Sequence, residues 1–434
     1  MALPGFTANL IFGWCFSVII LEKPWGIPKF KWLSFPIFFA FLYMPLFIFF
    51  NVDLIYHATD TLTGPSKERI DRLVRQLSYI ILLTSNSLIR IIFMWKGRKL
   101  ADFLRRLKFY SKSRAKANKN PLSLMDVVVT YLVFFSTAVV AINGGVVTYR
   151  NPVFESWLQE LSRLTHAIAF SCLFQLPVMI PVQCAFALIL ASMAYLGVIF
   201  GDYCQYVVYT LTQNKTKVGI SIISTSSSSE QGDQPQKPDV ENISATPSPP
   251  PPSQDHLFFT NQLRREILAK FEIVREIFDL AHEIVSPMAL VLLADSSIQV
   301  VMKGYETMFV GKAGMISNVG NMVNYVSYVW ILQSAQRLQN TISAGKAELE
   351  ETLVNLSDET NKLEKHALRD VLKAMSVWNW EFTACELFVI DRRLASGILS
   401  LILTYVIVLV QLKVSDDTPD FIALANATQA HRST

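Results

Sequence analysis

The sequence has few of the residues from which enzyme and metal sites are built. Its 434 residues include only five cysteines and six histidines, and none of them shows the paired spacing of metal ligands. It also has no glycine-rich phosphate loop and no nucleophile elbow. Four of the cysteines lie in apolar runs, so we interpret them as small buried residues rather than disulfide partners. We therefore expect a protein that is not an enzyme and carries no cofactor.

Charge is also scarce over long stretches. Charged residues make up 17% of the chain and hydrophobic residues 51%, and apolar runs repeatedly reach the roughly 20 residues that a helix needs to cross a bilayer. This predicts an all-α polytopic membrane protein rather than a soluble one. The net charge of +4 is modest, and the basic residues flank apolar runs. They indicate orientation in a membrane, and we expect no nucleic-acid partner.

Seven transmembrane helices are predicted, at residues 33–56, 73–95, 124–149, 167–211, 285–302, 316–331 and 394–412. The fourth apolar region is about twice the length that a bilayer requires, and Pro177 and Pro181 should kink its first half. Residues 6–21 are apolar, but no basic region precedes them. We interpret them as a membrane-surface or re-entrant helix, with an extra span as the alternative.

Basic residues after the second span set the predicted orientation. Residues 96–119 contain one acid, Asp102, and ten basic residues. These are Lys96, Arg98, Lys99, Arg105, Arg106, Lys108, Lys112, Arg114, Lys116 and Lys119. Because cytoplasmic loops carry the excess of Lys and Arg, this loop and the N-terminus should be cytoplasmic. With seven spans, the C-terminus is then extracellular.

The domains follow from these spans. We expect a cytoplasmic N-terminal segment (1–32), helices one to four (33–211), a disordered cytoplasmic loop rich in Ser and Pro (212–261), and an amphipathic helix with helices five and six (262–335). Cytoplasmic helices (336–393), helix seven (394–412) and an extracellular tail (413–434) complete the chain. In that tail, Asn426 begins an Asn-Ala-Thr glycosylation sequon.

An apolar stripe precedes the fifth span. Leu263, Ile267, Val274 and Phe278 recur at helical spacing within residues 262–282, and a second charged helix is predicted at residues 343–376. The two helices could simply be solvated. We favour the interpretation that they form a helical platform below the membrane, packed in an oligomer.

Polar residues inside the predicted spans form the candidate ligand site, because burial in a membrane demands partners for them. Hydrogen bonds between helices are the alternative for each one. Several share a helix face, and amides, carboxylates and Tyr rings suit a small polar ligand. The candidates are Asp295, Gln299, Asn318, Asn321, Tyr325, Tyr328, Asn143, Gln175 and Asn86.

The last apolar run, residues 394–412, contains few polar residues. Thr404 and Gln411 share one helix face, and so do Ser400 and Gln411. A Gln that faced lipid would lack hydrogen-bond partners. This face should therefore meet protein or water, as either a packing seam between helices or a pore wall.

The sequence of this run resembles the C-terminal signature of insect gustatory receptors, in which Thr-Tyr is followed by five mostly apolar residues and then by Gln-Phe. Here Thr404-Tyr405 precede five apolar residues and Gln411, but Leu412 stands in place of Phe. The similarity covers residues 378–412. Its lead-in comprises Glu381, Phe382, Thr383, Ala384, Cys385, Leu387, Phe388, Ile390 and Asp391.

The resemblance implies a ligand-gated cation channel of the plasma membrane, expected in sensory-neuron dendrites. In that family four subunits place helix seven around a pore, the ligand pocket lies in the outer half of helices one to six, and cytoplasmic helix ends anchor the subunits. By resemblance, Gln411 and Leu412 form the gate, with Thr404, Tyr405 and Ser400 along the same helix. The expected partners are membrane lipids, a small-molecule tastant, permeant cations, and other copies in a homotetramer or hetero-oligomer.

The kind of tastant is the least constrained expectation. Val406 follows Thr-Tyr where many sweet-taste members have Glu, which favours a bitter or other small organic compound over a sugar. Two other functions remain open. A G-protein-coupled receptor would need the opposite orientation, and its Asp-Arg-Tyr motif is absent after helix three. A transporter with polar sites at the midplane is the third possibility, although no internal repeat is visible.

Overall fold

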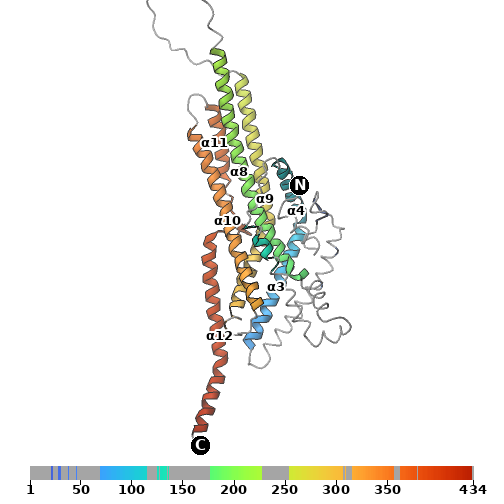
Figure 1. Ribbon diagram of the computed structural model, residues 1–434, viewed down its shortest axis with the longest axis vertical. Helices are drawn as coiled ribbons and strands as arrows, with labels where there is room; N and C mark the ends of the chain where they lie inside the picture. Colours follow the sequence, from blue (N-terminus) through green and yellow to red (C-terminus); the bar gives the residue numbers. More distant parts are fainter. Residues whose placement is uncertain are drawn as a thin grey trace, which may run out of the picture. The chain divides into compact units, whose positions relative to one another are not determined.

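The computed structural model is mainly helical. It describes residues 21–22, 28–30, 38, 45, 69–114, 125–126, 128–133, 135, 176–226, 254–305, 308, 315–355, 362–378 and 380–432. Seven helices are assigned in these ranges (Figure 1): α3 (Arg69–Trp95), α4 (Gly97–Arg114), α8 (Leu176–Ser226), α9 (Gln254–Tyr305), α10 (Met315–Asn355), α11 (Lys362–Val377) and α12 (Arg392–Arg432). The predicted all-α membrane class is confirmed.

Four segments of the described residues are long and apolar enough to cross a membrane. They are Gln76–Trp95, Ile180–Thr210, Gln262–Tyr305 and Arg392–Ser415, and they coincide with the predicted second, fourth, fifth and seventh spans. The predicted sixth span forms the first part of α10. The first predicted span and residues 6–21 lie almost wholly outside the described residues, and of the third only residues 125–126, 128–133 and 135, all helical, are described. The count of seven spans and their orientation therefore stay predictions.

The polar loop predicted at residues 212–261 has different limits in the structure. Helix α8 continues to Ser226, and α9 already begins at Gln254. No proline occurs in residues 211–226. The backbone therefore does not force the helix to stop after residue 211. Residues 227–253 lie outside the described part. The predicted tail is likewise helical to Arg432, because α12 continues past residue 412.

The chain divides into two compact units. The first unit comprises Met1–Leu196, Ile277–Leu338 and Glu381–Thr434, and the second comprises Gly197–Glu276 and Gln339–Trp380. The first unit includes α3, α4, α12 and the apolar parts of α8 to α10. Residues 183–193 of α8 are buried on every side, which marks a helix in the interior of a bundle.

The second unit has an aromatic core, to which α8, α9 and the residue directly after α11 each contribute a ring. The Trp378 ring stacks on Phe200 at 6.1 Å between ring centroids and meets Phe271 edge-on at 5.6 Å. A Cβ added to Gly345 of α10 would lie 2.8 Å from both the Cys204 sulfur and the Phe200 ring. Only glycine therefore allows α8 and α10 to approach so closely here.

The predicted apolar stripe is buried. Leu263, Ile267, Val274 and Phe278 are between 0% and 8% exposed, which confirms the helical spacing used to predict the helix. Beside the stripe, Arg264 pairs with Asp370 of α11 at 2.7 Å. The predicted second helix, residues 343–376, comprises the end of α10 and all of α11, which are separated by residues outside the described part.

Candidate functional site

Polar contacts join α3 to α9 within the first unit. The Ser78 hydroxyl donates to Oε1 of Gln299 at 2.8 Å, and Nε2 of Gln299 donates to the Ser78 carbonyl at 2.9 Å. Both residues are buried. Gln299 was predicted as a candidate, whereas Ser78 was not, because its partner lies 221 residues away in sequence. This pair satisfies the polar atoms of Gln299 and fixes two antiparallel helices side by side.

Asp295 lies one helical turn before Gln299 and is only 5% exposed. It forms a hydrogen bond with Ser85 of α3, while its Oδ1 atom has no hydrogen-bond partner among the described residues. A buried carboxylate oxygen without a partner is costly in an apolar environment. Asp295 is therefore the described candidate with the clearest capacity to accept a hydrogen bond from a further group.

Asn86 also lies on α3, and its side-chain amide forms hydrogen bonds with the backbone of α3 and of α8. Its Nδ2 donates to the Leu82 carbonyl at 2.7 Å, and its Oδ1 accepts the Val182 amide of α8 at 3.2 Å. Val182 directly follows Pro181, which lies inside α8. Because proline disturbs the helical hydrogen bonds around it, Asn86 has a packing role here, and a role in binding ligand stays a prediction.

The two tyrosines predicted to share a face of α10 differ in exposure. Tyr328 is 6% exposed and its hydroxyl has no hydrogen-bond partner in the described residues, whereas Tyr325 is 46% exposed. Asn318 and Asn321 belong to the same helix, but their side chains lie outside the described set. The same holds for the Asn426 side chain on α12, and Asn143 and Gln175 lie outside the described residues altogether.

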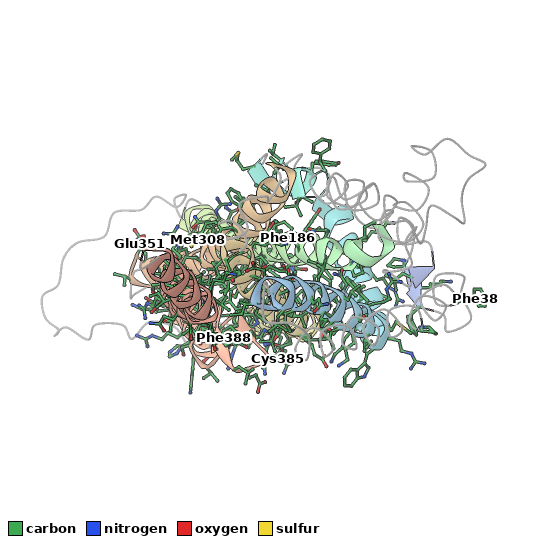
Figure 2. All side chains as sticks on the ribbon, turned by 90° about the horizontal axis from the view of Figure 1, so that it is seen from below. Phe38, Phe186, Met308, Glu351, Cys385 and Phe388 are labelled. Atoms are coloured by element: carbon green, nitrogen blue, oxygen red, sulfur yellow. The ribbon has the colours of Figure 1, made fainter. Side chains whose placement is uncertain are left out.

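A hairpin that the sequence did not predict precedes α12. Strands β3 (Thr383–Ala384) and β4 (Phe388–Val389) pair antiparallel, and Cys385 and Glu386 in the turn have positive φ angles of 50° and 61°. Figure 2 labels Cys385 and Phe388 on this hairpin. A positive φ is uncommon for residues other than glycine, so the surrounding structure must hold this turn in place.

Helix α9 supplies that support. Ser286 Oγ accepts the Cys385 amide at 2.7 Å, and His282 Nε2 lies 3.3 Å from the Thr383 hydroxyl. The Phe382 ring is fully buried and packs edge-on against His282. The residues before α12, which carry part of the family resemblance, thus pack against the middle of α9. The position where α12 begins is fixed by contacts to that helix.

Helix α12 has two unlike sides. Ile398, Ile402, Val406, Leu409 and Lys413 recur every three or four residues and are partly covered. Ser400, Thr404 and Gln411 are exposed; each lies two residues from a covered position, so roughly 200° around the helix. The predicted shared face of these three polar residues is therefore turned away from the bundle. Tyr405 and Leu412 are 54% and 51% exposed and lie beside that face.

Polar contacts at two points and one close approach relate α12 to the rest of its own unit. At the start, Nε and Nη2 of Arg392 donate to Gln333 of α10 at 3.0 and 2.7 Å. Midway, a Cβ built on Gly304 of α9 would lie 4.0 Å from Val406. Further along, Lys413 pairs with Asp71 of α3 at 3.3 Å. These contacts fix which side of α12 faces outward.

These features together define a polytopic helical membrane protein with one apolar helix that its own chain leaves largely uncovered. A sequence profile of the 7tm chemosensory receptors matches residues 7–416. The chain therefore belongs to the 7tm chemosensory receptor family. This confirms the predicted resemblance to insect chemoreceptors.

Solved structures with this fold include an insect olfactory receptor, OR5 from Machilis hrabei. Its complex with eugenol shares 12% sequence identity with a TM-score of 0.61, over 94% of this chain and 98% of the receptor. A second structure of the same receptor shares 11% identity with a TM-score of 0.57, over 94% and 97%. At such identities the likeness concerns the fold alone. No curated protein matches the sequence.

Proposed function

We propose that this receptor is a ligand-gated, non-selective cation channel that responds to a small organic tastant. Four copies would surround a pore lined by α12. The observation that carries this proposal is the polar side of α12, where Ser400, Thr404 and Gln411 are exposed opposite the side that contacts the bundle. In lipid, an amide on such a face would lack partners. Around a pore it meets water and the matching residues of three further copies.

We place the gate at the outer end of the polar side of α12. Gln411 and Leu412 are both exposed and neighbour each other, so four copies would present a ring of amides beside a ring of leucines. An apolar ring can close a pore by expelling water. Leucine is smaller than the phenylalanine that the family signature carries here, and we expect a wider constriction. Thr404, Tyr405 and Ser400 would lie along the pore on the inner side of the gate.

The ligand would bind among α3, α9 and α10, near Asp295 and Gln299. The free Oδ1 atom of Asp295 and the buried Tyr328 hydroxyl both lack a partner among the described residues, and a polar ligand could supply one. Asn86, Tyr325 and the undescribed candidates Asn318, Asn321, Asn143 and Gln175 belong to this proposal from their sequence positions. A plant bitter compound is favoured over a sugar, because Val406 replaces the Glu of many sweet-taste receptors.

Helix α9 is the element through which such a ligand would act on the gate. It contacts the hairpin before α12 at Ser286 in its middle, carries Asp295 and Gln299 toward its end, and approaches Val406 at Gly304. A ligand shifts an equilibrium only if it binds the open state more tightly. We infer that binding repositions α9, and that α12 moves outward with it. The hydrogen bond from the hairpin to Ser286 and the close approach of Gly304 to Val406 support this route.

The orientation belongs to the same proposal. The N-terminus would be cytoplasmic and the C-terminus extracellular, in the plasma membrane of a sensory neuron. An epitope tag after Thr434 should be labelled on intact cells. Labelling only after permeabilisation, at confirmed surface expression, would reverse the orientation and remove the gate from the outer side.

The test of function is a recording from excised patches without GTP. Eugenol, quinine and fructose, representing aromatic, bitter and sugar ligands, would be applied to cells that express the full chain. A cation current evoked by any one of them supports the channel. A response that appears only in intact cells and needs GTP would favour a G-protein-coupled receptor, and saturable ligand uptake without current would favour a transporter.

The gate has its own test in Gln411→Ala. Removing the amide ring should change the half-maximal ligand concentration or the relative permeability to sodium and potassium by roughly fivefold or more, the lower range of allosteric coupling. Gln262→Ala is the matched control, because Gln262 is an exposed glutamine of the second unit. Surface biotinylation should be equal for both variants. Currents identical to wild type would remove Gln411 from the gate.

A further inference from the structure

A partly buried ion pair joins the gate helix to the bundle just beyond the residues proposed to form the gate. Nζ of Lys413 lies 3.3 Å from Oδ2 of Asp71, in the first turn of α3. The Tyr305 hydroxyl, at the end of α9, donates to Oδ1 of the same carboxylate at 2.8 Å. One carboxylate thus connects three helices. We call these three residues the clasp.

The clasp is unusually well shielded for an ion pair of this chain. The Lys413 and Asp71 side chains are 13% and 14% exposed, and Tyr305 is 0% exposed. In other ion pairs that the described residues form, at least one side chain is 43% exposed or more; Arg105 and Asp102, for example, are 56% and 54% exposed. A shielded pair is weakly screened by salt, and removing one partner leaves the other charge partly buried without this ion pair. Separating Lys413 from Asp71 is therefore costly.

The position of Lys413 also fixes the rotation of α12. Lys413 lies two residues after Gln411, so the two side chains point roughly 200° apart. When Lys413 reaches Asp71, Gln411 must face away from the bundle. The bonds from Arg392 to Gln333 act at the other end of the helix, and none of the most apolar window of this helix is buried in the described structure.

The clasp is linked to the proposed ligand site by two rigid helices. Asp71 lies two turns from Ser78 on α3, and Tyr305 lies six residues after Gln299 on α9. Ser78 and Gln299 are themselves joined by two hydrogen bonds. Any movement of this helix pair therefore carries Asp71 and Tyr305 with it, and the ion pair transmits the movement to Lys413.

We propose that Asp71, Tyr305 and Lys413 are positioning residues of the gate. The ion pair keeps the outer end of α12 moving with α3 and α9, so ligand binding opens the gate less effectively when the pair is broken. This inference rests on the proposed channel function. It adds the element that couples the ligand site to the gate.

Charge reversal tests the coupling. Lys413→Glu and Asp71→Lys should each shift the half-maximal concentration of the most effective probe among eugenol, quinine and fructose upward by roughly tenfold, within the range of allosteric coupling. They should also lower the maximal current. The double variant restores an ion pair in reverse and should recover most of both losses. Tyr305→Phe, which removes one donor to Asp71, should give a smaller shift of about threefold.

The matched control exchanges Asp102 and Arg105, which form an exposed pair at 3.3 Å on α4. Neither its single reversals nor its double reversal should change the currents. Surface biotinylation separates gating from folding, and currents are compared at equal surface levels. Additive losses in the clasp double variant, or a leftward shift in the single variants, would overturn the proposal, because a coupling pair predicts recovery and weaker activation.

A second experiment, chemical cross-linking, does not depend on measuring a channel current. In Asp71→Cys/Lys413→Cys, a short bis-maleimide should link the two cysteines within one chain, and mass spectrometry of the joined peptides should detect the link. If the wild type conducts but neither rescue nor linkage occurs, the clasp fails while the channel stands. If the link forms but no probe evokes any wild-type current, the channel proposal fails, and the gating role of the clasp fails with it.

Discussion

Two helices of similar apolarity occupy opposite environments in this receptor. In the apolar span of α8, 78% of the most apolar window is buried by the chain itself, whereas in that of α12 none is buried. Apolar character alone therefore does not identify what a helix contacts. The α8 residues already have their partners within one copy. The α12 residues need lipid or further copies, and the polar side of α12 argues for further copies around water.

The largest expected contrast comes from the same substitution in both helices. Leu196 of α8 is 0% exposed, and Leu403 of α12 is 55% exposed. Leu196→Ala should lower the free energy of unfolding by about 2–5 kcal/mol, because it leaves a cavity. Leu403→Ala should cost less than about 1 kcal/mol in a single copy. Thermal unfolding of the purified receptor in detergent measures both, and equal losses would contradict the contrast.

Two glycines give the next contrast. An added Cβ at Gly345 would meet Cys204 and Phe200 at 2.8 Å, while at Gly397 of α12 it would meet nothing within 4 Å. Gly345→Ala should therefore destabilise by about 1–3 kcal/mol through overpacking. Gly397→Ala should be neutral or stabilise by up to about 1 kcal/mol, because alanine favours a helix. A destabilising Gly397→Ala would show that a further copy already packs against that position.

The smallest contrast concerns two serines. Ser78 is buried and hydrogen-bonded to Gln299, whereas Ser396 is exposed and donates only to the Arg393 carbonyl of its own helix. Ser78→Ala should cost about 1 kcal/mol, and Gln299 should then be partly unsatisfied. Ser396→Ala should change stability by no more than a few tenths. Adding Gln299→Leu to Ser78→Ala should cost less than the sum of the two single variants, since the residues share one interaction.

The sequence could predict where the helices run and which of their sides are apolar. Leu263, Ile267 and Phe278 were placed on one buried side by their spacing, and the structure buries all three. Apolar length placed the spans in α3, α8, α9 and α12, because about 20 uncharged residues have few alternatives to a membrane helix. The family signature, a local pattern near the end of the chain, identified the receptor family.

The site's long-range pairs could not be predicted in this way. Ser78 and Gln299 are 221 residues apart, and Asp71 and Lys413 are 342 apart, and no local period signals such partners. The turn at Cys385 and Glu386 was missed as well. Positive φ is normally announced by glycine or asparagine, and neither occurs there. Asn86 was predicted as a ligand-binding residue, which stays a prediction; its burial and its bond to the backbone beside Pro181 depend on the fold.

The most direct measurement is cysteine accessibility along α12 in a background that lacks exposed Cys385. Single cysteines would replace Ser400, Thr404 and Gln411 on the polar side, and Ile398, Ile402 and Leu409 on the covered side. A membrane-impermeant cationic thiol reagent would be applied from outside during ligand-evoked current. The account predicts rapid block at Gln411, slower block at Thr404 and Ser400, and no block on the covered side. Block confined to the covered side, or no block at any position, would contradict a pore lined by the polar face of α12.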